Sequence, residues 1–153
     1  MHYDGTSWKA MDNPAANYYG IWGSSSSEAF AVGGEGTVLH YQYGGFSTSA
    51  VPGGYTLRAV WGTSSSDIFA VGDAGTIMRY NGTAWTAMPS ATANSLYAVT
   101  AITATDVYAV GDDGVLHYDG SARALMRGGN PLRAGWGFSP SAVFAIGDGG
   151  IFG

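Results

Sequence analysis

The sequence predicts an all-β fold in which one four-stranded unit occurs four times within a single domain, residues 1–153. A first landmark, Val-Gly or Ile-Gly, has glycines that are 39, 39 and 36 residues apart. These glycines are Gly33, Gly72, Gly111 and Gly147. A second landmark, His-Tyr or Arg-Tyr, has tyrosines 38, 39 and 38 residues apart. These tyrosines are Tyr3, Tyr41, Tyr80 and Tyr118. Two landmarks with one period indicate internal repetition.

Inside the unit at residues 56–90, turn signals separate four short apolar segments that we expect to be strands. They are Leu57–Trp61, Ile68–Val71, Thr76–Tyr80 and Thr83–Met88. β-branched and aromatic residues dominate them, and none is long enough for a typical helix. Glycines close the second segment, and Asn81-Gly82 after the third is a strong hairpin signal. Four antiparallel strands in about 39 residues form the blade of a β-propeller.

One blade of the predicted propeller is divided between the two ends of the sequence. His2–Met11 contains the end of a third strand and a fourth, whereas Leu132–Phe152 contains two strands and the start of a third. Neither part could bury its faces alone, so we expect the terminal strands to join in one blade. A single chain could close a four-bladed ring in this way. Two chains could instead exchange terminal strands in an eight-bladed homodimer. Small residues at repeated strand positions favour this larger ring slightly, because they let neighbouring sheets approach closely.

Three segments of the sequence read almost alike: WGSSSSEAFAVGGEG from Trp22, WGTSSSDIFAVGDAG from Trp61 and WGFSPSAVFAIGDGG from Trp136. With the His-Tyr-Asp-Gly ends of the units, they resemble the blades of bacterial β-propeller repeat proteins. They are also loosely similar to sialidase-type and photosystem-assembly-factor propellers. The resemblance covers the whole chain and implies the propeller fold. The Ser-x-Asp-x-Gly-x-x-Trp box of sialidases is absent, which disfavours a hydrolase.

The titratable residues predict neither a metal site nor a catalytic site. Calcium requires six to eight oxygens around one point, but the Gly-Asp-x-Gly turns supply one Asp per blade and are explained by turn chemistry. These residues are Asp73, Asp112 and Asp148. The histidines occupy one repeat position on separate blades, too far apart to share a zinc ion, and we expect them to face solvent or a neighbouring blade. They are His2, His40 and His117. We therefore expect no enzyme activity and no cofactor.

The charge of the chain excludes two classes of partner. Its net charge is −5, only 11% of its residues are charged, and no basic cluster occurs. A nucleic-acid backbone and an anionic membrane surface are therefore not expected partners. The absence of cysteine leaves the cellular location open.

Four large polar residues are the first candidate ligand-binding site. They are Tyr19, Arg58, Tyr97 and Arg133. The first strand of a blade lines the central channel, so they should form a ring at its mouth, with the Gly-Asp turns on the same rim. Alternation places the residues two positions further along on the same face: Ile21, Val60, Val99 and Gly135. The ring either plugs the channel by Arg–aromatic stacking or holds a sugar, an acidic group or a peptide.

The second candidate site consists of the repeated tryptophans, Trp22, Trp61 and Trp136. Indoles could stack on sugars, but they could also fill the space between blades, which we favour. The predicted function is therefore a non-enzymatic binding module, lectin-like or recognising a peptide or polymer. The alternative is a structural, self-assembling propeller scaffold or fragment with no specific ligand.

Overall fold

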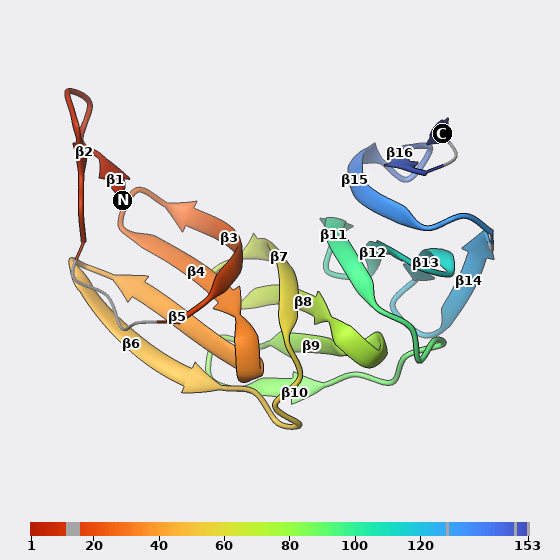
Figure 1. The fold of residues 1–153 in the computed structure, drawn as a ribbon, viewed down its shortest axis with the longest axis horizontal. Helices are drawn as coiled ribbons and strands as arrows, with labels where there is room; N and C mark the ends of the chain where they lie inside the picture. The colour runs from red at the N-terminus through yellow and green to blue at the C-terminus, as the bar shows by residue number, and fades with distance from the viewer. Residues whose placement is uncertain (12–15, 128, 149, 153) are drawn as a thin grey trace.

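The computed structural model describes residues 1–11, 16–127, 129–148 and 150–152, and their regular structure is almost entirely β (Figure 1). The helical segments in these ranges are two three-residue 3-10 turns, η1 (Gly34–Gly36) and η2 (Asp73–Gly75). No helix in the described ranges is long and apolar enough to cross a membrane. The predicted all-β blade-repeat fold is confirmed.

Three complete four-stranded sheets follow one another along the chain, and we number them blades 1 to 3. Blade 1 contains β3 (Tyr18–Ser25), β4 (Glu28–Gly33), β5 (Thr37–Gln42) and β6 (Gly45–Ala50). Blade 2 contains β7 (Leu57–Ser64), β8 (Asp67–Gly72), β9 (Ile77–Tyr80) and β10 (Trp85–Ala87). Blade 3 contains β11 (Leu96–Thr103), β12 (Asp106–Gly111), β13 (Gly114–Tyr118) and β14 (Arg123–Arg127). In each sheet, neighbouring strands are antiparallel and consecutive in sequence.

The two ends of the chain form smaller sheets. Blade 4 has three strands, β15 (Leu132–Ser139), β16 (Ala142–Gly147) and β17 (Gly150–Phe152), and a separate hairpin pairs β1 (His2–Tyr3) with β2 (Trp8–Lys9). The blades are arranged in an open arc with the hairpin and blade 4 at opposite ends (Figure 1). We expected the strands of His2–Met11 and Leu132–Phe152 to join in one blade. Within one chain, the described parts of these two segments instead lie apart, in separate sheets (Figure 1).

The four strands expected at residues 56–90 are present as β7–β10, with small differences in length. The first continues beyond Trp61 to Ser64, because Ser64 still pairs with Asp67 at the start of β8. The predicted hairpin turn follows β9, and the Asn81 side chain accepts hydrogen bonds from the backbone amides of Thr83 and Ala84. Turn chemistry therefore explains this Asn-Gly pair.

The repeated Val-Gly glycine is required by a close approach between two backbone segments. A Cβ atom added to Gly72 would lie 1.9 Å from the carbonyl oxygen of Thr56, just before β7. The corresponding distance is 2.1 Å for each of the other three glycines, Gly33, Gly111 and Gly147. A side chain at any of them would force the second strand away from the segment that precedes the first.

The Trp-Gly pair of the repeat packs neighbouring blades together in one direction. The indole of Trp22 in blade 1 covers Gly62 in blade 2, where an added Cβ would lie 2.6 Å from the ring. Trp61 of blade 2 reaches blade 3, where its Nε1 donates to the carbonyl oxygen of Ala101 at 3.3 Å. Ile102 of blade 3 covers Gly137 of blade 4 in the same manner. The side chain from one blade thus covers a glycine or alanine of the next.

Apolar cores fill the spaces between blades. Between blades 1 and 2 the core includes Phe30, Val32, Leu57 and Met78, each at most 1% exposed. A second core lies between blades 2 and 3, built around Phe69 and Leu96. Burial of these side chains against a neighbouring sheet is the main force that holds the arc together.

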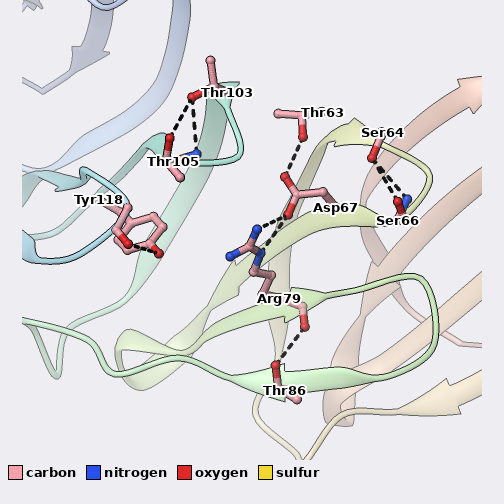
Figure 2. A network of polar contacts seen from close by, with 10 residues as sticks. Thr63, Ser64, Ser66, Asp67, Arg79, Thr86, Thr103, Thr105 and Tyr118 are labelled. Atoms are coloured by element: carbon pink, nitrogen blue, oxygen red, sulfur yellow. Dashed lines mark hydrogen bonds and ion pairs between the residues drawn. The ribbon is translucent and has the colours of Figure 1, made fainter.

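A polar brace joins the second and third strands inside each complete blade. Asp67 at the start of β8 accepts hydrogen bonds from Thr63 and Arg79, which Figure 2 shows, and the Arg79–Asp67 pair is 2.7 Å apart. The same places hold Glu28 and His40 in blade 1, 3.0 Å apart, and Asp106 and His117 in blade 3, 2.7 Å apart. The partly buried imidazoles of His40 and His117 also stack on Phe30 and Tyr108 of their own blades, whereas His2 is exposed.

Candidate functional site

Each of the four predicted ring residues is the extra residue of a β-bulge in the first strand of its blade. In β7, Leu57 pairs with Gly72 and Ala59 with Val71, so Arg58 between them has no partner of its own. The pairing register shifts in the same way around the other three residues, so each of them also lacks a partner. They are Tyr19, Tyr97 and Arg133. A bulge turns a side chain away from the normal alternation of a strand. The four predicted ring positions therefore share one backbone irregularity, which recurs in every blade.

The bulges direct three of these side chains to the turns that follow the second strands. Arg58 pairs with Asp73, the Tyr97 hydroxyl donates to Asp112 at 2.9 Å, and Arg133 lies 3.4 Å from Asp148. The Gly-Asp turns of blades 2, 3 and 4 therefore lie beside these three side chains. Their carboxylates bind side chains of the first strands, and within the described residues those of Asp73 and Asp112 make no hydrogen bond to the backbone of their own turns.

Tyr97 lies between the two arginines. The Cζ atom of Arg58 is 5.5 Å from its ring centroid and that of Arg133 is 4.7 Å away. In such cation–π contacts the negative face of the aromatic ring attracts the guanidinium. The hydrogen bond to Asp73 raises the pKa of Arg58, and contact with Tyr97, aided by Asp148, raises the pKa of Arg133. Both guanidiniums therefore remain charged at any physiological pH.

The ring is unequal along the arc. Tyr19 is 56% exposed, and Gly34 stands in blade 1 where the other blades have aspartate. The Arg133 side chain is 50% exposed and its Asp148 partner 62%, whereas the Arg58 and Asp73 side chains are 38% and 32% exposed. The polar groups most available to a ligand are thus at the two ends, Tyr19 and Arg133.

The expectation that Val60 and Val99 share the face of the ring is wrong, because the bulges interrupt the alternation on which it rested. Val60 is 5% exposed in the core between blades 1 and 2, and Val99 is 6% exposed in the core between blades 2 and 3. Bulges lack a residue signature, so only the unusual recurrence of large polar residues at one position could have indicated them.

The second candidate residues, the tryptophans, lie along the blade–blade contacts. Trp22 packs against the first core, and Trp61 meets Trp136 edge to face with centroids 5.0 Å apart. Trp136, in blade 4, is 48% exposed. Across the described residues, no group of three or more His, Cys, Asp or Glu is placed to hold a metal ion.

Comparison with known proteins identifies the fold but no family. No family model matches the chain, and no curated protein sequence matches it. A structure of YCF48 bound to D1 peptide superposes with a TM-score of 0.72 at 16% identity, covering 95% of this chain and 52% of that one. The WD40 β-propeller domain of Doa1 gives 0.73 at 9% identity, covering 88% of this chain and 49% of that one.

A third similar structure, the computationally designed Ika4 protein, gives a TM-score of 0.73 at 14% identity and 94% coverage of both chains. The chain thus spans about half the length of the YCF48 and Doa1 chains and nearly all of Ika4. With the blade order and the repeated blade contacts, these likenesses show that the chain has the β-propeller fold.

Proposed function

We propose that the chain is a non-enzymatic recognition module that binds a peptide at the ring of Tyr19, Arg58, Tyr97 and Arg133. The observation that carries this proposal is the repeated bulge, which places a large polar side chain at one rim position of every blade. A bulge re-aims a side chain away from the normal alternation of a strand, and bulges are over-represented next to functional sites.

The exposed groups of the ring suit an extended peptide with an acidic group. Arg133 is held only loosely by Asp148, so its guanidinium can donate to a carboxylate, while the phenol of Tyr19 offers an amphipathic surface. The likeness to YCF48, whose structure holds a D1 peptide, supports peptide rather than a small molecule.

The test is a peptide selection followed by mutagenesis of the ring. Short random peptides are selected on the unmodified chain, and affinity for the best one is measured by fluorescence anisotropy. Replacing Arg58 and Arg133 together with Gln should weaken binding about tenfold or more, because hydrogen bonds to charged groups are worth about 1.5–3 kcal/mol each. Replacing Arg123 with Gln, on the outer strand β14, is the matched control. Unchanged affinity in the double variant would place the peptide elsewhere.

A second candidate function, a self-assembling scaffold, is favoured by apolar faces exposed at the two ends of the arc. Phe144 and Ile146 of blade 4 are 48% and 47% exposed, although their repeat equivalents Phe30 and Val32 of blade 1 are at most 1% exposed. At the other end, Ile21 of blade 1 is 76% exposed, while its equivalents in blades 2 and 3 are buried. The internal blades cover these same positions with a neighbouring blade.

The occupant that fits both faces is a second copy of the chain, because the two ends have the two halves of the Trp-Gly contact. Trp136 is half exposed, and the three atoms nearest a Cβ added to Gly23 all belong to its own blade. Trp136 of one copy would cover Gly23 of the next, and Arg133 would meet another Tyr19, which continues the alternation of the ring. Two such halves would close one eight-bladed ring, with the β1–β2 hairpin of one copy completing blade 4 of the other.

Light scattering tests the scaffold. We expect twice the 15.8 kDa chain mass, falling to that of one chain when Gly23 is replaced by Leu. Replacing Tyr55, an exposed aromatic residue away from both end faces, with Ala should not change the mass. A mass of one chain at all concentrations would refute the second-copy interface and leave the peptide proposal standing.

A further inference from the structure

An open groove lies between the outer strands of blades 1 and 2, apart from the ring and from both ends of the arc. Its volume is about 380 Å³, within the range of roughly 300–1,000 Å³ that is usual for small-molecule sites. The corresponding space between blades 2 and 3 holds a cavity of about 20 Å³. The two spaces have the same place in the repeat but are lined by different side chains.

One difference between the two linings is a change of residue at a single repeat position. Met88 of blade 2 follows β10 opposite Ile77 and lines the small cavity between blades 2 and 3. The residue in the same place of blade 1 is Ser49, which pairs with Val38. Exchange of a thioether chain for a hydroxymethyl group removes the atoms that would fill the space between the sheets.

The walls of the groove are polar on one side and aromatic on the other. Ser47 and Ser49 on β6 and Thr83 before β10 line it, and within the described part of the chain their hydroxyls make no hydrogen bond to protein. Opposite them are Trp85 and Tyr80, whose rings are 5.3 Å apart. The hydroxyls can both donate and accept hydrogen bonds, and the indole offers a flat apolar surface.

His40 also lines the groove and is held in place. Its Nε2 is 3.0 Å from Glu28, and its ring stacks on Phe30 with centroids 4.1 Å apart. Glu28 in turn accepts a hydrogen bond from Ser24. The imidazole therefore has a fixed orientation, as a residue that selects among similar polar ligands needs.

From this juxtaposition we propose that the groove binds a neutral pyranose sugar. Such a ring has hydroxyls around its edge for Ser47, Ser49 and Thr83, and a face of C–H groups for the indole of Trp85. The equivalent of Trp85 in the next blade is Arg123, which stacks on Tyr118, so the groove is specific to blades 1 and 2 rather than a general feature of the repeat. This site goes beyond the proposed peptide site and shares no residue with it.

Nuclear magnetic resonance titration tests the site with three probes: methyl α-D-mannoside, methyl β-D-galactoside and methyl β-D-glucoside. We expect at least one of them to shift the Trp85 indole and Ser49 amide signals saturably. Ser49→Met, which introduces the methionine of the neighbouring blade, should weaken that binding at least about tenfold and should not lower the melting temperature. Ser47→Ala with Ser49→Ala should weaken it several-fold without filling the groove.

Two control variants show whether sugar binding depends on the groove itself. Thr48→Met adds the same bulk to β6 at a position that does not line the groove, and should leave sugar affinity unchanged. Arg58→Gln with Arg133→Gln should also leave it unchanged, which distinguishes the groove from the ring. The proposal is overturned if none of the three sugars shifts these signals, or if Ser49→Met binds as well as the unmodified chain. It is equally overturned if the peptide selected on the ring, rather than a sugar, occupies the groove.

Discussion

Replacing Gly33 with Ala tests the close approach that the Val-Gly repeat imposes. The added Cβ would lie 2.1 Å from the Asn17 carbonyl oxygen, and contacts under 3.0 Å essentially never occur, so the backbone must move by about 1 Å. This movement also threatens the hydrogen bond from the Gly34 amide to the same oxygen, which is 3.0 Å long. Strain of about 1–3 kcal/mol and loss of a bond worth about 1 kcal/mol give a destabilisation of about 2–4 kcal/mol.

The adjacent residue provides a matched control. A Cβ added to Gly34 has no atom within 4 Å, and its φ is not in the left-handed region, so Gly34→Ala should change stability by less than about 0.5 kcal/mol. Thermal unfolding followed by circular dichroism should show a fall of about 4–16 °C for Gly33→Ala and almost none for Gly34→Ala. Equal melting temperatures for the two variants would refute the steric reasoning.

Two further predictions concern carboxylates. Gly34→Asp gives blade 1 the carboxylate that the other blades have, and the Tyr19 hydroxyl should then donate to it as the Tyr97 hydroxyl does to Asp112. In nuclear magnetic resonance spectra the Tyr19 hydroxyl proton should become protected from solvent exchange. An unchanged exchange rate would show that the Tyr19 side chain does not point to this turn. In the turn after β13, hydrogen bonds from the backbone amides of Ala122 and Ser121 lower the pKa of Asp119 from 3.8 to about 2. Its stabilisation should therefore be complete above pH 3.8 and be lost as pH falls through about 2, which a carbon-13 titration of its carboxyl checks. Asp119→Asn, which copies Asn81 of blade 2, should keep the turn but remove this pH step, and a step that persists would assign it to another group.

The sequence was sufficient for the blade repeat because its strongest signals are local. Asn81-Gly82 fixes a hairpin by its own turn chemistry, and Gly72 recurs because nothing larger fits its position. Both signals can be interpreted within one unit, without the structure of the neighbouring blade. The order and approximate bounds of β7–β10 could therefore be predicted from residues 56–90 alone.

The geometry of the candidate site depends on contacts between segments, which local signals do not encode. The bulge at Arg58 is a shift in the pairing register between β7 and β8, and no residue type predicts it. The role of Asp73 was misjudged for the same reason, because a favourable turn residue gave no sign of its contact with an arginine 15 positions earlier. The groove beside Ser49 is visible only when the sheets of two blades are compared.

The one-way packing of Trp22 on Gly62 has a consequence for how such a chain can grow. Each blade of this type contains both members of the contact, an indole for the blade after it and a glycine for the blade before it. A copy of such a blade, inserted between two existing blades, would therefore already have the side chains that pack against both of them. It would need no compensating substitution. Insertion beside blade 3 would be less tolerant, since there Thr100 and Ala101 replace the Trp-Gly pair and Ile102 makes the onward contact.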